Sequence, residues 1–219
     1  MANSTSISTT SSNKTAKHTS AHVKQISIVT KSGKEISPYL DAAARLRIEV
    51  FREYPYLYNG DLAYENDYLR YYCECEQSIF VLAYSDQEII GVSTGLPLSS
   101  ANAAFQQAFA DHDVSIEKIF YLGESVLLSE YRGRGIGHAF FDHRENHAKL
   151  LGYHTTAFCA VDRPENHILR PANYRSNAHL WQKRNYQEHR ELSANLAWQE
   201  IGHTEEQQNT LHFWLRHAP

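Results

Sequence analysis

The sequence predicts an α/β domain in which helices flank a sheet of about seven strands. Three observations support this prediction. Short β-rich runs alternate along the chain with amphipathic helical segments. A glycine-rich run over residues 132–137 lies between one apolar strand-like run and one helix. The chain has 219 residues, of which 42% are hydrophobic, so it can bury a sizeable core as one domain.

The first part of the predicted domain combines one strand with two helices. Residues 25–30 alternate weakly between polar and apolar side chains, which is typical of a strand. Ser37 is expected to be the N-cap of the first helix, because Pro38 follows it at a position where a missing N–H costs nothing. Pro55 ends this helix. The expected elements are a strand over 25–30, a helix over 38–53, an aromatic link over 54–60 and a helix over 61–75.

The middle of the chain predicts a β-hairpin. Two β-rich runs flank Ser85-Asp86-Gln87, a polar segment of the kind that forms a tight turn. Gly95 and Pro97 are expected to end the second run, since both residues interrupt regular strands. The expected elements are strands over 78–84 and 88–94, followed by a short helix over 101–110.

The last part begins with an apolar strand, the glycine-rich run and an amphipathic helix that ends near Gly152. A long polar loop then separates one further strand from a short helix, and a second hairpin closes the chain. The expected elements are a strand over 120–128, a helix over 136–151, a strand over 155–161, a loop over 162–173, a helix over 176–184 and strands over 192–200 and 210–216.

Residues 1–24 form a separate segment that is rich in Ser, Thr, Asn and Lys and has almost no large apolar side chains. Such a segment cannot offset its ordering entropy by burial, so we expect a disordered tail before a domain over residues 25–219. It lacks the apolar stretch of a secretory signal. A transit peptide is a weaker alternative, because the segment has no Arg and no amphipathic stripe.

Composition narrows the class of function. The net charge is −4 and no basic stripe appears, so nucleic acid is not an expected partner. No apolar run approaches the roughly 20 residues that span a bilayer, so we expect no membrane partner. The cysteines Cys73, Cys75 and Cys159 cannot pair completely and lack zinc-site spacing, which favours a reducing cytoplasm. His143 and His147 lie one helical turn apart without a third ligand, so no metal is expected.

The glycine-rich run reads Arg132-Gly133-Arg134-Gly135-Ile136-Gly137 and opens a helix. Glycines let the backbone approach a ligand, and the helix N-terminus adds unpaired N–H donors, so the run suits a pyrophosphate. A dinucleotide GxGxxG fails at His138, and no P-loop sequence occurs. The remaining pattern, Arg followed by Gly at +3 and +5, resembles the acyl-CoA signature (Q/R-x-x-G-x-G/A) of the GCN5-related N-acetyltransferase (GNAT) family.

The resemblance covers residues 25–216 in element order and is specific over 120–152. It implies a central mixed, mostly antiparallel sheet that splays at its middle strands, and transfer of an acetyl group from acetyl-CoA to a small-molecule or peptide amine. A homodimer is compatible with it. It implies that the strand end pairs through its backbone with the pantetheine arm and that the loop holds the pyrophosphate. The implied coenzyme A site is Val126, Leu127, Leu128, Arg132, Gly133, Arg134, Gly135, Ile136, Gly137 and His138.

Two carboxylates are candidates for handling the amine proton. Glu124 lies two residues before Val126 on the same face of an apolar strand, where a carboxylate costs free energy unless it is paired or serves a function. It is therefore either a catalytic group or a structural partner of an arginine. Asp162 follows the next strand and is either a second candidate or a loop anchor.

The late helix departs from the family pattern N-x-x-A-x-x-L-Y-x-x-x-G-F, whose tyrosine protonates the leaving thiolate. Aligned through Leu180, this chain has Trp181 at the tyrosine position. An indole N–H donates a hydrogen bond but is no proton source near pH 7. Tyr174, Tyr186 or a water remain as alternatives. A non-catalytic acyl-CoA-binding or sensory module therefore competes with the acetyltransferase, and a nucleotide-binding protein is a third class.

The acceptor is not fixed by the sequence. By the resemblance, the link between the first two helices and the loops after the later strands border the acceptor site. Polar and aromatic residues in both segments are either its walls or ordinary packing residues: Tyr54, Tyr56, Tyr58, Asp61, Arg163, Glu165 and Arg170. A polyamine, an aminoglycoside, an amino acid and a protein N-terminus all remain open.

Overall fold

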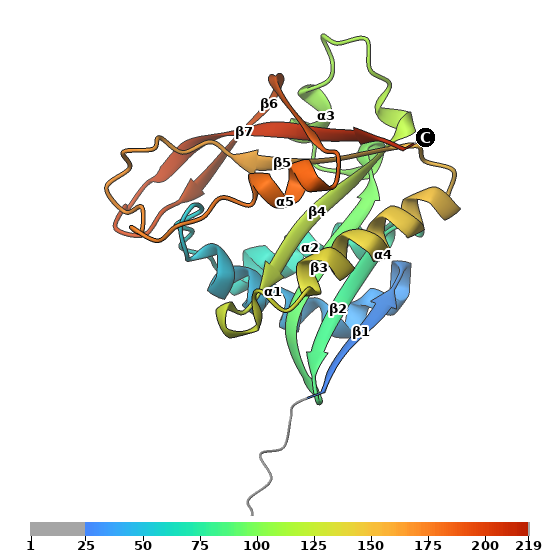
Figure 1. The fold of residues 1–219 in the computed structure, drawn as a ribbon, viewed down its shortest axis with the longest axis horizontal. Helices are drawn as coiled ribbons and strands as arrows, with labels where there is room; N and C mark the ends of the chain where they lie inside the picture. The colour runs from blue at the N-terminus through green and yellow to red at the C-terminus, as the bar shows by residue number, and fades with distance from the viewer. Residues whose placement is uncertain (1–24, 219) are drawn as a thin grey trace, which may run out of the picture.

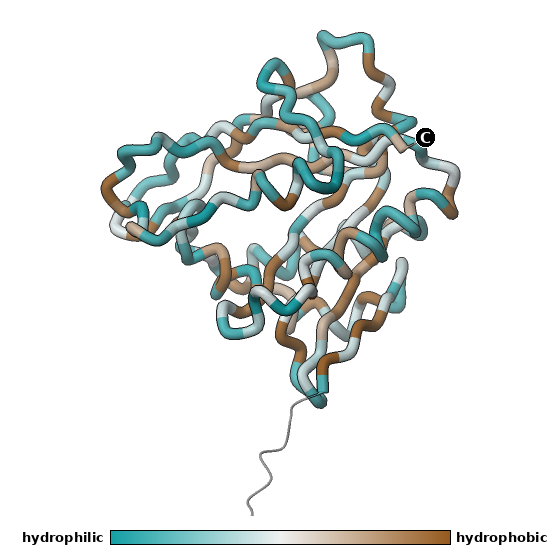
Figure 2. The backbone as a smooth tube through the Cα atoms, viewed as in Figure 1, coloured by the Kyte–Doolittle hydropathy of each residue, from teal (hydrophilic) through white to brown (hydrophobic). Residues whose placement is uncertain are grey.

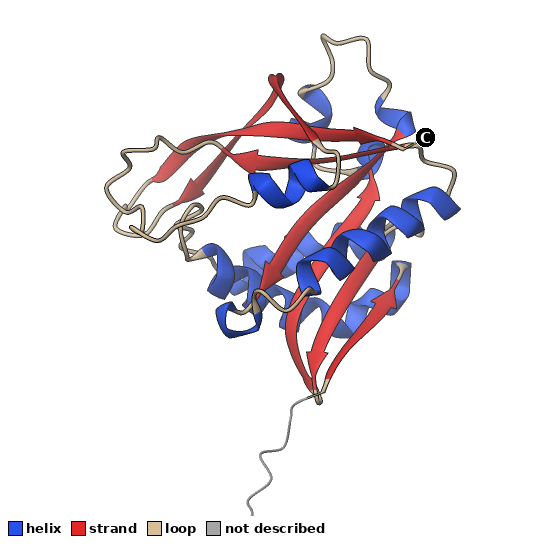
Figure 3. Ribbon diagram, viewed as in Figure 1, coloured by secondary structure: helices blue, strands red, loops and turns tan. Residues whose placement is uncertain are grey.

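The computed structural model describes residues 25–218 and contains one seven-stranded sheet in these residues. The strand order is β1-β2-β3-β4-β5-β7-β6, and strands and helices alternate as the sequence predicts (Figure 1, Figure 3). The expected disordered tail, residues 1–24, lies outside the described residues. The strands are β1 Ile26–Lys31, β2 Ile79–Ser85, β3 Glu88–Pro97, β4 Ile119–Leu127, β5 Thr155–Val161, β6 Gln187–Gln199 and β7 Glu206–His217.

Helices cover both faces of the sheet. One hydrophobic core joins α1, α2 and α3 to the sheet, and a second joins α4 and α5 to its other face (Figure 1). Hydrophobic positions concentrate along the central strands, whereas the loop between β5 and α5 is mostly hydrophilic (Figure 2). The α-helices are α1 Leu40–Phe51, α2 Leu62–Glu74, α3 Ala103–Gln107, α4 Ile136–Leu150 and α5 Ala178–Lys183.

The sheet splits between β4 and β5. All neighbouring strands pair antiparallel except these two, which run parallel and pair only from Ile119 with Thr155 to Tyr121 with Ala157. Beyond Tyr121 the strands separate, although β4 continues to Leu127 and β5 to Val161. The mixed, splayed sheet that the sequence analysis expects is therefore present. The split leaves backbone groups of β4 without a neighbouring strand.

A β-bulge lies in the part of β4 that borders the split. Ser93 opposes Ser125 and Gly95 opposes Leu122, so Thr94 of β3 faces two residues of β4, Gly123 and Glu124. A bulge redirects the side chains that follow it. Here it places Glu124 on the face of the sheet covered by α1 and α2, the face to which Val126 also belongs.

Two expected boundaries in the first half of the domain are wrong. Ser37 is not the N-cap of an α-helix: Gly33–Tyr39 forms a 3₁₀ segment, closed by a bond from the Leu40 N–H to the Ser37 carbonyl, and α1 starts at Leu40. Gly95 does not end β3, which continues to Pro97. Within the strand, position 95 needs a glycine because a side chain there would approach Phe120 to 2.6 Å. Pro97 is the last strand residue, where a missing N–H is tolerated.

The two C-terminal strands are longer than the sequence predicts. β6 begins at Gln187 rather than 192, and β7 begins at Glu206 rather than 210. Their added residues are polar and, apart from Asn209, half-buried or exposed, so they carry no apolar alternation. Among the described residues, no helix is both long and apolar enough to cross a membrane.

Candidate active site

The backbone of Leu127 faces the split between β4 and β5. The Leu128 N–H donates to the Ile90 carbonyl at 3.0 Å. Because hydrogen-bonded and non-hydrogen-bonded pairs alternate along an antiparallel ladder, Leu127, which opposes Gly91, directs its N–H and C=O away from β3. Val126 and Leu128 direct theirs toward β3. Leu127 is therefore the one of these three positions whose main chain points into the split, where its carbonyl accepts from Arg132 and its N–H faces the space for an extended ligand arm.

The glycine-rich loop follows immediately and ends at the first turn of α4. Gly133 and Gly135 have φ values of 75° and 84°, and Gly135 is the N-cap residue of the helix. A side chain at either glycine would meet nothing within 4 Å, so the space in front of the loop is open. The first N–H groups of a helix lack intrahelical acceptors. The loop therefore presents free donors, at the positive end of a 15-residue helix, to an open space that suits a phosphate.

The two arginines of the loop fold back onto it. Arg132 donates from Nε to the Leu127 carbonyl at 3.1 Å and pairs with Glu53 at 2.7 Å. Arg134 donates to the Glu130 carbonyl at 2.9 Å and lies over the Tyr131 ring. Both arginines are exposed, as is His138 on the first turn of α4. Because Glu53 already pairs with Arg132, Arg134 is the arginine whose charge is more readily available to an anion. Of the residues expected to hold coenzyme A, Val126 and Ile136 are buried, whereas residues 132–135 and His138 are exposed between the end of β4 and the first turn of α4.

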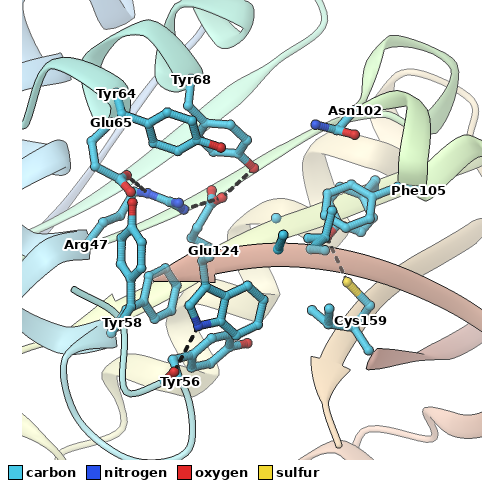
Figure 4. Close-up of a pocket in the computed structure, with 17 residues that line it drawn as sticks. Arg47, Tyr56, Tyr58, Tyr64, Glu65, Tyr68, Asn102, Phe105, Glu124 and Cys159 are labelled. Atoms are coloured by element: carbon cyan, nitrogen blue, oxygen red, sulfur yellow. Dashed lines mark hydrogen bonds and ion pairs between the residues drawn. The ribbon is translucent and has the colours of Figure 1, made fainter. Parts of the chain in front are cut away.

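A cavity of about 150 Å³ lies on the α1 and α2 face of the sheet, beside the split (Figure 4). Tyr121, Gly123 and Glu124 of β4 and Cys159 of β5 line it, so it borders both strands at the point where they separate. Its walls carry three charged side chains, which are Arg47, Glu65 and Glu124. Eight aromatic side chains complete most of its walls: Phe51, Tyr56, Tyr58, Tyr64, Tyr68, Phe105, Tyr121 and Trp198.

Glu124 is held by a dense set of partners. Its carboxylate pairs with Arg47 and accepts hydrogen bonds from Tyr68 at 2.7 Å and Thr94 at 2.5 Å. Tyr72 donates to the same carboxylate at 3.2 Å. Arg47 also pairs with Glu65, so one guanidinium joins two buried carboxylates (Figure 4). The Arg47 guanidinium is therefore paired with a carboxylate on each side.

These partners decide the charge of Glu124. Burial raises the pKa of the carboxyl, but Arg47, followed by the hydrogen bonds from Thr94 and Tyr68, outweighs burial and lowers the pKa below its ordinary value. Glu124 is therefore ionised at neutral pH. A general base works best with a pKa near the working pH. The carboxylate is thus better suited to hold an amine and to stabilise positive charge on its nitrogen than to store a proton.

The backbone around Glu124 is fixed from both faces of the sheet. The Glu124 N–H donates to Thr94 Oγ1 at 3.0 Å, and Gly123 leaves room because a side chain there would lie 2.3 Å from the Tyr72 hydroxyl oxygen. From the α4 face, Arg144 donates to the carbonyls of Thr94 at 3.1 Å and Glu124 at 3.3 Å. Arg144 is 1% exposed, and burial lowers its pKa to about 10. It satisfies the carbonyls that the bulge frees.

The other polar groups of the cavity are neutral. Burial, followed by the nearby Cys159, raises the pKa of Tyr121, and burial raises the pKa of the Cys159 thiol to about 12. Their Oη and Sγ atoms lie 3.2 Å apart across the split. Burial likewise raises the pKa values of Tyr56 and Tyr68. These side chains therefore supply hydrogen bonds and aromatic faces without charge.

The remaining candidates of the sequence analysis lie elsewhere. Asp162 is exposed and faces Arg190 and His212, at 3.9 Å and 3.5 Å. Tyr174 packs edge-on against Tyr54 with a centroid distance of 4.6 Å, in the loop between β5 and α5. Neither side chain lines the cavity.

Tyr186 and Trp181 also lie outside the cavity. The Tyr186 hydroxyl is buried on the α4 face, 2.8 Å from Thr156 Oγ1. Trp181 packs against Phe158 and Trp214 in the core on that face, at centroid distances of 5.0 Å each. The structure therefore places Glu124 in the cavity, on the strand that leads into the glycine-rich loop, and places the late-helix aromatics apart from the cavity.

The expected acceptor walls are partly present. Tyr56 and Tyr58 line the cavity, whereas Tyr54 does not, and Asp61 caps α2 by accepting from the Tyr64 N–H. Arg163 secures the link between α1 and α2 by donating to the Pro55 carbonyl at 2.7 Å. The remaining two, Glu165 and Arg170, bond to each other within the loop, where the Arg170 side chain donates to the Glu165 carbonyl.

Arg47, Glu65, Tyr68 and Tyr121 are cavity residues that the sequence analysis missed. The sequence pattern could have indicated two of these residues. Arg47 lies four residues after Ala43 and so shares the buried face of α1, and Glu65 shares the buried face of α2 with Leu69. A charge on the buried face of each of two adjacent helices indicates either a mutual pair or a site.

We expect Trp181→Phe to leave coenzyme A affinity and kcat/KM within about threefold of the wild type. Trp181 contacts core aromatics rather than the cavity, so the substitution removes packing volume and one N–H donor. A stability loss of about 1–2 kcal/mol is expected, typical of a core truncation. Steady-state kinetics and thermal melting measure the two effects. A dead but folded Trp181→Phe would show that the indole takes part in the reaction.

The described residues contain no group of three or more His, Cys, Asp or Glu side chains placed to hold a metal ion. Of the two histidines spaced by one turn, His147 has Nε2 within 2.9 Å of the Gln77 carbonyl, and His143 is exposed. These two histidines thus lie on the outer side of α4, one in contact with a neighbouring loop and one exposed to solvent.

Comparisons with known proteins agree with this geometry. The family model "Acetyltransferase (GNAT) family" matches residues 44–172. Among solved structures, ribosomal-protein-alanine N-acetyltransferase from Brucella melitensis has a TM-score of 0.56 at 13% identity, with 87% of this chain and 99% of that chain covered. NAA60 from Arabidopsis thaliana, in complex with a bisubstrate analogue, has a TM-score of 0.56 at 11% identity, covering 88% and 98%.

A third similar structure is yncA from Salmonella typhimurium with its cofactor acetyl-CoA, with a TM-score of 0.55 at 8% identity and coverage of 89% and 94%. No curated protein sequence matches the chain. At these identities the solved structures establish the fold alone. The family model, however, covers more than half of the chain and includes β4, the glycine-rich loop and α4. The chain belongs to the GNAT family of acetyltransferases.

Proposed function

We propose that this protein transfers the acetyl group of acetyl-CoA to a primary amine bound in the cavity. One observation carries the proposal: β4 runs from the cavity, where the amine would bind, to the loop, where the acetyl donor would bind. Its end, at Leu127, faces the split and leads into the phosphate-binding loop, while Glu124 and Tyr121 of the same strand line the cavity. An acyl-CoA arm along the split would bring its thioester to the cavity wall.

The residues present fit coenzyme A. The open space in front of Gly133 and Gly135 admits a pyrophosphate to the loop, and the N-terminus of α4 offers donors and a favourable dipole. Arg132 and Arg134 add charge that is not buried. The Leu127 backbone offers a site for the amide groups of pantetheine. The similarity to yncA, determined with acetyl-CoA, supports the same choice of donor.

The reaction needs no covalent enzyme intermediate. The lone pair of a neutral amine attacks the thioester carbonyl, a C–N bond forms, the C–S bond breaks, and the amine loses one proton. The thiolate of coenzyme A takes up one proton and leaves as the thiol, so the products are an N-acetyl amine and free coenzyme A. A thiol pKa of about 8.5 makes this leaving group stable enough without a dedicated acid.

The protein contributes position and charge to this step. Glu124 is ionised, and its charge stabilises the attacking nitrogen, which becomes positive as the C–N bond forms. Holding the amine against the thioester replaces a bimolecular encounter by an intramolecular one. The proton then passes to solvent. Tyr121 and Cys159 are both neutral and bond to each other, so one of the two donates to the other and one donor of the pair is left for the thioester at the split.

Amine-dependent release of thiol from acetyl-CoA tests the proposal. The purified full-length chain is incubated with acetyl-CoA and a panel of primary amines, and free thiol and acetylated product are measured in parallel. We expect equal amounts of thiol and N-acetyl amine. Coenzyme A binding without turnover on any amine would instead support a non-catalytic acyl-CoA-binding module.

A further inference from the structure

The cavity wall carries excess negative charge. Arg47 pairs with both Glu65 and Glu124, so one guanidinium faces two carboxylates and the wall has a net charge of −1. The nearby Arg144 does not line the cavity; it lies on the opposite face of the sheet, where its guanidinium donates to backbone carbonyls and to the Ser125 hydroxyl rather than to a carboxylate. The tyrosines and Cys159 contribute no compensating charge.

One atom of this wall lacks a partner. Glu65 is completely buried and lines the cavity, and its Oε1 forms no hydrogen bond with any described residue. Burial, followed by an interaction of the hydroxyl with the Glu65 carboxylate, raises the pKa of Tyr58. The protonated Tyr58 hydroxyl is therefore the donor next to Glu65, but it does not reach Oε1 with the geometry of a full hydrogen bond. A buried carboxylate oxygen without a donor is costly. A positively charged ligand would satisfy it.

The remaining walls also suit a cation and exclude an anion. Aromatic faces attract ammonium groups through their quadrupoles, and Arg47 already demonstrates this by lying 4.6 Å from the Tyr68 ring centroid and 5.0 Å from that of Phe51. Arg47 is the only cationic side chain among the lining residues, and two carboxylates engage it. A carboxylate of a substrate would therefore find no partner in the cavity.

The cavity is closed on one side by a rigid wall. Tyr56 and Tyr58 come from the link between α1 and α2, and this link is fastened to β6. Trp198 donates from Nε1 to the Tyr56 carbonyl at 3.1 Å, Asn59 N–H donates to the Gln199 carbonyl at 2.9 Å, and Tyr58 pairs with Glu200 as a β-bridge. A wall tied to the sheet in this way favours a compact ligand over a polypeptide that must pass through.

We propose that the acceptor is a small cationic amine that carries no carboxylate, such as an alkyl diamine, and that Glu65 binds its positive charge beside Glu124. This inference rests on the proposed function and deepens it. α-Amino acids are then poor acceptors, because their carboxylate would be buried without a partner next to two carboxylates. A peptide N-terminus is a poorer fit than a free amine because of the tied wall.

Cadaverine and lysine form a matched pair that tests the inference, since lysine is cadaverine with one added carboxylate. We expect the wild type to prefer cadaverine by about 100-fold or more in kcat/KM, as burial of an unpaired charge predicts. A peptide amide with a free N-terminal alanine is the third arm and is expected to react slowly. Equal use of lysine, or preference for the peptide, would overturn the proposed substrate class.

A binding measurement separates this inference from the proposed function. Cadaverine and lysine are titrated calorimetrically into the protein saturated with coenzyme A, which requires no turnover. Cadaverine binding without any thiol release would refute the proposed reaction and keep the site. Thiol release from other amines with no discrimination against carboxylates would keep the reaction and refute the cationic site.

Glu65→Gln tests the role of Glu65 Oε1, the carboxylate oxygen without a full hydrogen bond. It removes the charge and keeps the shape, and we expect cadaverine binding to weaken by about 10- to 100-fold while coenzyme A affinity stays unchanged. Glu74→Gln, an exposed position on the same helix, is the matched control and should change neither. If Glu65→Gln does not fold, the wild-type comparison of cadaverine with lysine still decides. A folded Glu65→Gln that binds cadaverine normally would contradict the assignment.

Discussion

Replacing Gly135 by valine is expected to abolish coenzyme A binding while the domain stays folded. Gly135 has a φ of 84° and is the N-cap residue of α4. A β-branched residue avoids this conformation, so the loop must change its backbone and withdraw the N–H groups that would bind phosphate. The new side chain would also occupy the open space in front of the loop.

The size of the effect follows from the lost hydrogen bonds. Bonds to a charged group contribute about 1.5–3 kcal/mol each, and two of them correspond to about 10²- to 10⁴-fold in Kd. We therefore expect coenzyme A affinity to fall by at least about 100-fold, measured by calorimetry. Acetyl transfer should fall in parallel.

Gly152→Val is the matched control. Gly152 also has a positive φ, 86°, also has open space where a side chain would lie, and follows the other end of α4. Both variants should lose similar stability, about 1–3 kcal/mol for a strained backbone. Only Gly135→Val should lose coenzyme A. Wild-type affinity in Gly135→Val, or equal loss of affinity in both variants, would show that this loop is not the phosphate site.

The glycine loop was predictable because its information is local. The turn between β4 and α4 requires glycine at positive φ, and the helix start requires no distant partner, so residues 132–137 contain the whole signal. The strand before the loop and the helix after it were predicted for the same reason. That Trp181 is not the acid stays a prediction, and the sequence could not show that its side chain packs against Phe158 and Trp214 on the face opposite the cavity.

The cavity was only partly predictable because its residues meet through the tertiary fold. Glu124 stands out in an apolar strand, but its partner Arg47 lies 77 residues earlier and Glu65 lies on a third element. A charge on the buried face of a helix identifies a residue that needs a partner, yet it does not identify which one. The β-bulge that turns Glu124 toward Arg47 depends on Thr94, Gly123 and Arg144 together.

Arg144 shows how support for the site can come from the opposite face of the sheet. Its guanidinium bonds to the carbonyls of Thr94 and Glu124 and to Ser125 Oγ at 2.9 Å, all beside the bulge. A buried cation with only carbonyl and hydroxyl acceptors is costly unless it replaces the strand hydrogen bonds that the bulge removes. The bulge, and with it the orientation of Glu124, therefore depends on α4 as well as on α1 and α2.

Glu124→Gln is expected to lower kcat/KM for the acceptor by about 10²- to 10⁴-fold, the range of a positioned catalytic group. The amide keeps the shape but loses the charge that stabilises the nitrogen as it becomes positive. Coenzyme A affinity should stay nearly unchanged, because the carboxylate lies in the cavity and not at the loop. Kinetics with saturating acetyl-CoA measure the first effect and calorimetry the second.

The pH profile distinguishes charge stabilisation from proton storage. The pKa of Glu124 is lowered in the folded protein, so the carboxylate is ionised above the ordinary glutamate range, about pH 4.3, and loses its charge and its contribution to stability only as the pH falls below that range. Between pH 6 and 9 the profile should therefore rise only as the acceptor ammonium loses its proton. Glu124→Gln should lower the whole profile without moving its acid side.

Glu145→Gln provides the control for loss of a paired carboxylate. Glu145 is half of ion pairs with Arg184 and Arg216 on the α4 face, away from the cavity, so its loss should reduce stability and leave kcat/KM within a few fold. If Glu124→Gln is fully active, or is no worse than Glu145→Gln, Glu124 is only a structural partner of Arg47. If Glu124→Gln instead removes an ionisation near neutral pH from the profile, Glu124 accepts the proton itself. Charge stabilisation by an ionised carboxylate predicts neither result.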